Sequence, residues 1–210
     1  ALRGVLDRTA LGDQAGVLIT SAIEHPSIRE PGYGLSLTGV MVVNLPINRD
    51  GLIDPEDLAA ALDQYAKPTR TTLVSIHWAN NETGVLQDIA KLTSFLPQGN
   101  VIFHTDAVQA LGKIPVDFNQ LGGNLMTLSS HKIYGPKGIG ALYVRRKPKV
   151  HVIEQIHGGR HERGMRSGTL ATHQIVGMGE AVAIAKQEMH EENKRLREEI
   201  ASLRGWEMNA

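Results

Sequence analysis

The sequence contains no cysteine among its 210 residues, which excludes disulfides and thiolate metal sites. It has no excess of either charge, because 22 Lys and Arg residues balance 22 Asp and Glu residues. A balanced charge provides no electrostatic case for binding nucleic acid or an anionic membrane surface. No apolar run approaches the roughly 18 residues of a membrane-spanning helix. The nine histidines do not fall at the spacing of metal ligands, so we expect no metal site.

The two ends of the sequence resemble the interior of a protein. The first eight residues form a charged helical pattern without an initiator methionine and without the features of a signal peptide. The last six, from 205 to 210, could begin a new strand. We therefore expect the sequence to start and stop within structural elements, and we expect a cytoplasmic protein.

Short apolar runs rich in β-branched residues alternate with helical patterns along the sequence. Strands are predicted at 17–20, 40–43, 71–78, 101–104, 125–128 and 140–144. Helices are predicted at 55–65, 88–96 and 173–203. The first of these follows Asp54, a good N-cap, and begins with Pro55, which suits the first helical turn. The alternation is typical of an α/β fold with a largely parallel sheet.

One lysine, Lys132, stands between polar side chains and a glycine-rich turn. Ser129, Ser130 and His131 precede it, and three glycines follow within eight residues. Hydroxyls, an imidazole and the backbone amides of glycines can together surround a phosphate. The alternative interpretation is a surface loop that carries a lysine by chance.

An aspartate, Asp106, follows the apolar run at 101–103. A buried carboxylate requires a cationic partner, which a pyridinium ring would supply; the alternative is an N-cap for a helix at 107–111. An aspartate at a strand end, followed later by a lysine after Ser and His, is the layout of a pyridoxal phosphate (PLP) site. There the lysine forms a Schiff base with the aldehyde, and the carboxylate keeps the pyridine nitrogen protonated. Gln109, one turn after Asp106, would lie near the same ligand.

Three further segments carry candidate functional groups. His25, at the exit of the first strand, is either a surface histidine before a proline or an aromatic plate stacked on a cofactor ring. Asn81 lies in a segment typical of a turn, and its amide could also donate to a ring oxygen or to a substrate carboxylate. Residues 157–169 contain three arginines, two histidines and four glycines. Such a loop usually exists to meet an anion or another subunit.

Together these segments resemble the cysteine desulfurases that serve iron–sulfur cluster assembly. That family belongs to the fold-type I PLP enzymes and is close to the class V aminotransferases. The resemblance covers the sequence essentially from end to end. The matching segments are residues 21–25, 79–89, 104–109, 129–145 and 161–169.

The resemblance implies a role for each residue near the cofactor ring. Lys132 would be the Schiff-base lysine, and Asp106 would pair with the pyridine nitrogen. His25 would stack on the ring and help to move protons. Gln109 would bond the ring hydroxyl, and Asn81 would lie beside both the cofactor and the substrate.

The resemblance also implies a phosphate site that two protomers share. Ser129 and His131 would hold the phosphate of one protomer's cofactor. Thr169 would reach the phosphate of the other protomer's cofactor, so a homodimer is expected. The family acts on L-cysteine, yields L-alanine, and passes the sulfur through an enzyme cysteine toward iron–sulfur scaffold or sulfur-acceptor proteins.

The sequence departs from the family pattern in several respects. The nucleophilic cysteine is missing, and Gly-Gly-Gly-His becomes Gly-Gly-Arg-His at 158–161. We expect residues 1–190 to form a large PLP-binding domain that is incomplete at both ends. Residues 191–210 would form a connecting helix toward a missing small domain, so this chain alone should not complete sulfur transfer. The alternatives are a PLP-dependent lyase acting on cystine or selenocysteine, and a non-catalytic scaffold that binds assembly partners.

Overall fold

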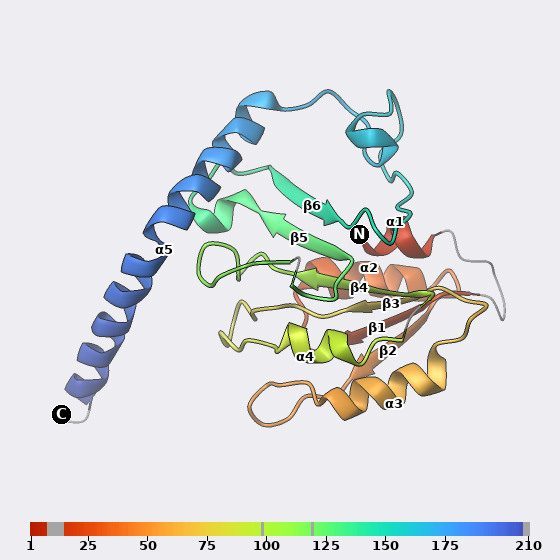
Figure 1. The fold of residues 1–210 in the computed structure, drawn as a ribbon, viewed down its shortest axis with the longest axis horizontal. Helices are drawn as coiled ribbons and strands as arrows, with labels where there is room; N and C mark the ends of the chain where they lie inside the picture. Colours follow the sequence, from red (N-terminus) through yellow and green to blue (C-terminus); the bar gives the residue numbers. More distant parts are fainter. Residues whose placement is uncertain (8–14, 98, 119, 208–210) are drawn as a thin grey trace.

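The computed structural model describes residues 1–7, 15–97, 99–118 and 120–207. Its centre is a six-stranded sheet with the strand order β2-β1-β3-β4-β5-β6 (Figure 1). The first five strands pair in parallel, and β6 pairs antiparallel to β5. This confirms the predicted α/β fold with a largely parallel sheet. The strands are β1 (Val17–Ser21), β2 (Met41–Leu45), β3 (Thr72–Ser75), β4 (Val101–Asp106), β5 (Leu125–Ser129) and β6 (Gly140–Val144).

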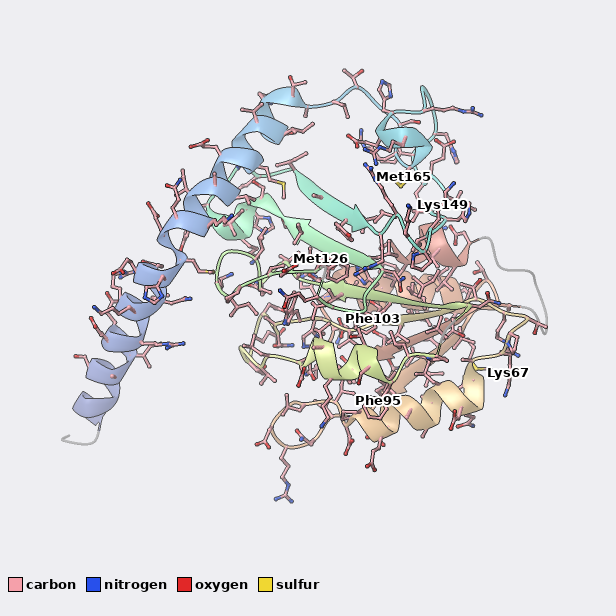
Figure 2. All side chains as sticks on the ribbon, viewed as in Figure 1. Lys67, Phe95, Phe103, Met126, Lys149 and Met165 are labelled. Carbon is pink, nitrogen blue, oxygen red and sulfur yellow. The ribbon has the colours of Figure 1, made fainter. Side chains whose placement is uncertain are left out.

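Apolar side chains cover both faces of the sheet, because successive residues of a strand point to opposite sides. In β1, Val17 and Ile19 pack into one core cluster together with side chains of α3 (Pro55–Tyr65) and α4 (Ile89–Ser94). Leu18 lies between them in sequence and packs into a second cluster with side chains of α1 (Leu2–Leu6) and α2 (Pro26–Ser36). Phe103 is completely buried in the first cluster, and Figure 2 shows it inside the body of the molecule. The helices are α1 (Leu2–Leu6), α2 (Pro26–Ser36), α3 (Pro55–Tyr65), α4 (Ile89–Ser94) and α5 (Thr172–Glu207).

Helix α2 was not predicted, because its sequence contains two prolines and two glycines. The first proline occupies the first helical turn, where no intrahelical N–H is required. His25 serves as the N-cap, and its Nδ1 accepts a hydrogen bond of 3.1 Å from the backbone N–H of Ser27. Gly32 faces β1 closely, since an added Cβ would lie 3.1 Å from Leu18. Close packing on the sheet thus stabilises a helix that local propensity disfavours.

Two boundaries differ from the sequence-based expectations. The predicted strand at 71–78 ends at Ser75, although the backbone N–H of Trp78 still donates to the carbonyl of Asp106. The segment 107–111, considered as a helix, consists of hydrogen-bonded turns instead. The polypeptide therefore changes direction directly after β4.

Helix α5 extends from the body of the molecule as a long arm (Figure 1). It continues through residue 190 without a break, and the proposed domain boundary there stays a prediction. Residues 205–207 continue the helix rather than starting the expected strand, and 208–210 lie outside the described residues. Within the described ranges, no helix combines the length and the apolar character needed to cross a membrane.

Candidate cofactor site

A cavity of about 560 Å³ lies at the carboxyl ends of the parallel strands. The sheet order places β2 on one side of β1 and β3 on the other, so the chain reverses its direction of winding beside β1. Ligands of open α/β sheets bind at such switch points, beyond the carboxyl ends of the strands. Seven of the predicted site residues line the cavity: His25, Asn81, Asp106, Gln109, Ser129, His131 and Lys132.

Lys132 is presented to the cavity by a short 3-10 helix, η2 (Ser130–Ile133), which joins β5 to the glycine turn. Its amine makes no hydrogen bond or ion pair with any side chain in the described part of the chain, and it is exposed. The glycines beside it permit close backbone approach. A Cβ on Gly140 would lie 2.6 Å from the carbonyl oxygen of Leu128, and a Cβ on Gly135 would collide with the Ser130 hydroxyl. The turn therefore places a free amine next to a compact backbone.

Asp106 is the last residue of β4 and is only 9% exposed. Its Oδ1 accepts a hydrogen bond of 3.0 Å from the backbone N–H of Val108. Burial raises the pKa of Asp106; that hydrogen bond lowers it, the charge of Glu24 raises it further, and His25 and His77 lower it. No cation of the described residues forms an ion pair with this carboxylate. Asp106 is therefore a buried acid that lines the cavity and has no cationic partner.

Gln109 comes from the turn after β4, and its amide is oriented by a neighbour. The Lys113 ammonium donates a hydrogen bond of 3.0 Å to Gln109 Oε1. Because an ammonium group can only donate, this contact leaves the NH₂ group of Gln109 to serve as a donor elsewhere. The backbone carbonyl of Lys113 in turn accepts a hydrogen bond from Asn193 of α5.

Ser129 and His131 flank the cavity at the end of β5. The Ser129 hydroxyl and the His131 Nδ1 are 2.7 Å apart and form a hydrogen bond. The hydroxyl, the imidazole and the nearby glycine amides are the donor types that hold a phosphate. These two residues are thus brought together as the sequence predicted, while their contact with a ligand stays a prediction.

The two adjacent asparagines have separate roles. Asn80 is buried and organises the turn: its Oδ1 accepts hydrogen bonds from the backbone N–H groups of Glu82 and Thr83, and its Nδ2 donates to the Ile23 carbonyl. Asn81 is exposed and lines the cavity. The turn interpretation therefore applies to the first asparagine, and the second keeps its side chain available.

Thr169 is not among the residues that line the cavity. It lies in the arginine-rich segment 157–169, where Arg160 adopts the left-handed backbone conformation with φ +56°. This region of φ favours glycine, so the arginine in the Gly-Gly-Arg-His segment is backbone-strained. Its N–H donates to the Ser167 hydroxyl at 3.0 Å, and that hydroxyl donates to Glu154.

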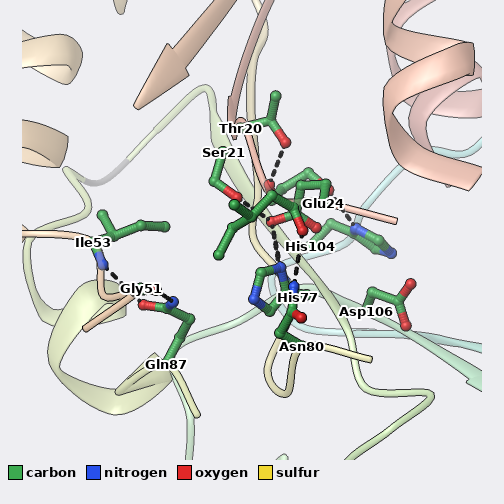
Figure 3. Close-up of polar contacts among 12 residues, drawn as sticks. Thr20, Ser21, Glu24, Gly51, Ile53, His77, Asn80, Gln87, His104 and Asp106 are labelled. Carbon is green, nitrogen blue, oxygen red and sulfur yellow. Dashed lines mark hydrogen bonds and ion pairs between the residues drawn. The ribbon is translucent and has the colours of Figure 1, made fainter. Parts of the chain in front are cut away.

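Sequence reasoning missed two residues of the site. His77 lines the cavity although it was assigned to the interior of a strand, and Glu24 is buried beside it. Figure 3 shows the Glu24 carboxylate against His77, with Asp106 on the neighbouring strand. In the sequence, the one indication of a role for Glu24 is its position next to His25. That position does not point to its contact with His77.

Comparison with known proteins places the chain in a family. The model of the aminotransferase class-V family matches residues 4–205. The chain belongs to the aminotransferase class-V family. Proteins of this family are PLP-dependent, which agrees with the predicted cofactor.

Individual relatives are more specific. The chain is 53% identical over 180 residues to "Cysteine desulfurase IscS" of Escherichia coli O139:H28 (strain E24377A / ETEC), a match that covers 86% of this chain and 43% of that relative. The protein of the same name from Klebsiella pneumoniae (strain 342) is 52% identical over the same length. The chain therefore spans less than half the length of these relatives.

Solved structures show the same architecture. A "NIFS-LIKE PROTEIN" superposes with a TM-score of 0.88 at 34% identity, covering 99% of this chain and 55% of that one. A structure described as "SspA in complex with cysteine" superposes with a TM-score of 0.78 at 37% identity, covering 87% of this chain and 50% of that one. These likenesses support the fold-type I assignment made from the sequence.

The side chains around the cavity suit PLP chemically. A buried carboxylate without a cationic partner matches a pyridine nitrogen, and a lysine amine without partners matches an aldehyde. The donor amide of Gln109 matches the ring hydroxyl, and the Ser129–His131 pair matches the phosphate. The residues present therefore fit the family's cofactor.

Proposed function

We propose that this chain forms the cofactor-binding part of a PLP-dependent cysteine desulfurase that acts on L-cysteine. The observation that carries the proposal is the meeting of Lys132 and Asp106 in one cavity, although 26 positions separate them in the sequence. Relatives named cysteine desulfurase, and a related structure described with cysteine, support this substrate class. When bound, PLP supplies an electron-accepting ring to the substrate amino acid.

Each residue that lines the cavity would have a role set by its position. Asp106 would hold the proton at the pyridine nitrogen, because its carboxylate is buried and, among the described residues, accepts a hydrogen bond only from the backbone N–H of Val108. Lys132 would anchor the cofactor and then accept or return a proton at the substrate α-carbon. His25 would lie over the ring from the N-cap of α2, where its Nδ1 is already engaged by Ser27. Asn81 would contact the substrate from the edge of the cavity.

Sulfur transfer requires a thiolate nucleophile that attacks the substrate sulfur. These 210 residues contain no cysteine, so the sulfur acceptor must come from outside them. We propose that delivery proceeds to iron–sulfur scaffold or other sulfur-acceptor proteins, and that the protein acts in the cytoplasm. This chain by itself is expected to bind the cofactor without completing the reaction.

We also propose that the chain forms a homodimer. Thr169 lies outside the cavity of its own chain, and apolar side chains are exposed along α5. Five of them are more than a third exposed: Ile175, Val176, Ile184, Leu196 and Ile200. Exposed apolar surface of this kind is typical of an interface. Sedimentation should show a dimer, and a monomer across micromolar concentrations would contradict the proposal.

Borohydride labelling tests the cofactor site. The protein is mixed with PLP, reduced with borohydride and digested, and the modified peptide is identified by mass spectrometry. We expect the label on Lys132, and the Lys132→Ala variant should lose it. Lys137 is also exposed and lies five residues away, so Lys137→Ala is the matched control and should label normally. Labelling that avoids Lys132 would refute the site.

A turnover assay separates the desulfurase from its alternatives. The protein is incubated with PLP, L-cysteine and a reductant, and alanine and sulfide are measured against free PLP. A desulfurase part without a thiol should release neither above the background. Strong, Lys132-dependent release of alanine would show a lyase instead. A non-catalytic scaffold would show no PLP labelling at all.

A further inference from the structure

His77 is a buried imidazole at the cofactor cavity to which the proposed function assigns no role. Only 3% of the residue is exposed, and it lines the cavity. In the register of β3 with β4, Ser75 pairs with His104, and the Trp78 N–H donates to the Asp106 carbonyl. Two residues beyond that pair, His77 and Asp106 therefore lie opposite each other. Because side chains alternate along a strand, both are on the same face of the sheet.

Glu24 lies against His77 from the connection between β1 and α2. Its side chain is completely buried. Its Oε1 accepts hydrogen bonds from the Ser21 hydroxyl at 2.8 Å and from the His77 backbone N–H at 2.9 Å. The same oxygen is 3.0 Å from His77 Nδ1 (Figure 3).

The side chains of His77 and Glu24 lie at ion-pair distance, but no hydrogen bond joins their side-chain atoms. The contact has the length of an ion pair, yet neither ring nitrogen of His77 forms a hydrogen bond with any described residue, and neither does Oε2 of Glu24. A carboxylate removed from water is costly unless a cation is next to it. The imidazole of His77 is the group in ion-pair contact with Glu24 that can provide this cation.

Figure 3 shows His104 and Asp106 near this pair, and the charge of His25 acts on Asp106 together with that of His77. His104 is neutral, because burial lowers its pKa to about 3, and its two ring nitrogens are occupied by Ser75 and Thr127. His25 is exposed, and its Nδ1 caps α2. His77 is therefore the buried imidazole of this group that can carry a proton between two carboxylates.

We propose that His77 and Glu24 form a buried imidazolium–carboxylate pair that keeps Asp106 ionised for the pyridine nitrogen of the cofactor. The inference rests on the proposed PLP site. His77 acts through Asp106, so it is a positioning residue and not a catalytic one. The pair adds a positive charge beside Asp106 and offsets the negative charge of Glu24, which would otherwise disfavour a second buried anion.

The pair can be tested first without any cofactor. The ring signals of His77 are followed by NMR against pH, with His77→Gln used to assign them. A neighbouring carboxylate raises the pKa of an imidazole, so Glu24→Gln should move the His77 titration to lower pH. An unchanged titration in Glu24→Gln, or a His77 that never takes up a proton above pH 5, would overturn the proposal.

The effect on Asp106 can be tested with pyridoxamine 5′-phosphate. This ligand has the same ring and phosphate as PLP, but it has an amine in place of the aldehyde and so forms no Schiff base with Lys132. We expect His77→Met, which replaces the imidazole by an apolar side chain, to weaken binding about tenfold at neutral pH, because the uncompensated charge of Glu24 disfavours the ionised form of Asp106. The double variant His77→Met/Glu24→Gln removes both charges and should recover most of that loss. The exposed His173 does not line the cavity, so His173→Met is the matched control.

Equal affinity of wild type and a folded His77→Met variant would overturn the proposal, with the fold checked by thermal melting. A double variant that binds as weakly as His77→Met would also overturn it, because the loss would then come from packing and not from charge. If wild type binds neither PLP nor the amine form, the proposed function fails, and the NMR titration still decides whether the pair exists.

Discussion

Replacing Asp106 by asparagine separates cofactor binding from folding, because the two should respond in opposite directions. Asparagine has nearly the same shape, and its Oδ1 can still accept the hydrogen bond from the Val108 N–H that Asp106 accepts at 3.0 Å. The substitution removes the negative charge and little else. Asp106→Asn therefore tests whether the negative charge of Asp106 contributes to the binding of a cationic ligand.

The expected loss of affinity follows from the bond that disappears. A hydrogen bond between a carboxylate and a charged donor contributes about 1.5–3 kcal/mol. This corresponds to a weakening of PLP binding by about 10-fold to 150-fold. Asp106 is buried and forms no direct ion pair with a described residue, so no contact within the described chain replaces the lost bond to the ligand.

The cofactor-free protein should behave differently. The pKa of Asp106 is raised on folding, mainly by burial. A carboxyl whose pKa is raised on folding destabilises the native state above that pKa, and this effect disappears as the pH falls toward its unfolded value near 4. Asp106→Asn should thus be at least as stable as wild type at pH 7. The difference should shrink on acidification.

The two quantities are measured in parallel, by titration with PLP and by urea unfolding at pH 7 and pH 4. Glu82→Gln is a suitable control, since Glu82 is exposed and does not line the cavity. Undiminished PLP affinity in Asp106→Asn would refute the assignment of this residue. A large loss of stability at pH 7 without cofactor would show that the carboxylate has a structural partner instead.

Three further predictions concern the fold. Phe103 is completely buried, so Phe103→Ala should reduce the free energy of unfolding by about 3–5 kcal/mol, whereas the partly exposed Phe95 should cost much less on the same change; equal losses in urea unfolding would contradict this. Asp54 accepts a hydrogen bond from the Glu56 N–H as the N-cap of α3. Asp54→Ala should therefore lower the free energy of unfolding by about 1 kcal/mol, and an unchanged thermal melting temperature would contradict this. His104 has a folded pKa of about 3, below its ordinary value of 6.5, so stability should fall as the pH drops between these values, and His104→Gln should flatten that slope in urea midpoints measured from pH 7 to pH 4.

Local patterns determined much of the architecture. The strand at 101–104 and the helix at 55–65 were predicted close to their observed bounds, because each is a short apolar run or an amphipathic pattern with clear end signals. Helix α2 was missed, since Pro31 and its glycines argue against a helix. Packing of Ile28, Gly32 and Leu35 against the sheet overrides that preference.

The site shows the same division. Lys132 and Asp106 could be singled out from the sequence, because each stands at the end of an apolar run beside residues of matching chemistry. Their meeting in one cavity depends on the parallel pairing of β4 with β5, which brings the carboxyl ends of both strands to one edge. The place of Thr169 outside that cavity likewise follows from the path of the chain after β6.

The sequence by itself determined the chemistry that these 210 residues offer: a lysine, an acid, an amide and phosphate-binding groups, without a thiol. Only the tertiary structure decided which side chains act together. His77 belongs to an unremarkable apolar strand in the sequence, and Glu24 lies 53 residues before it. Strand register places His77 beside Asp106. Burial of Glu24 brings its charge close enough to raise the pKa of Asp106. Both are long-range effects that no local pattern contains.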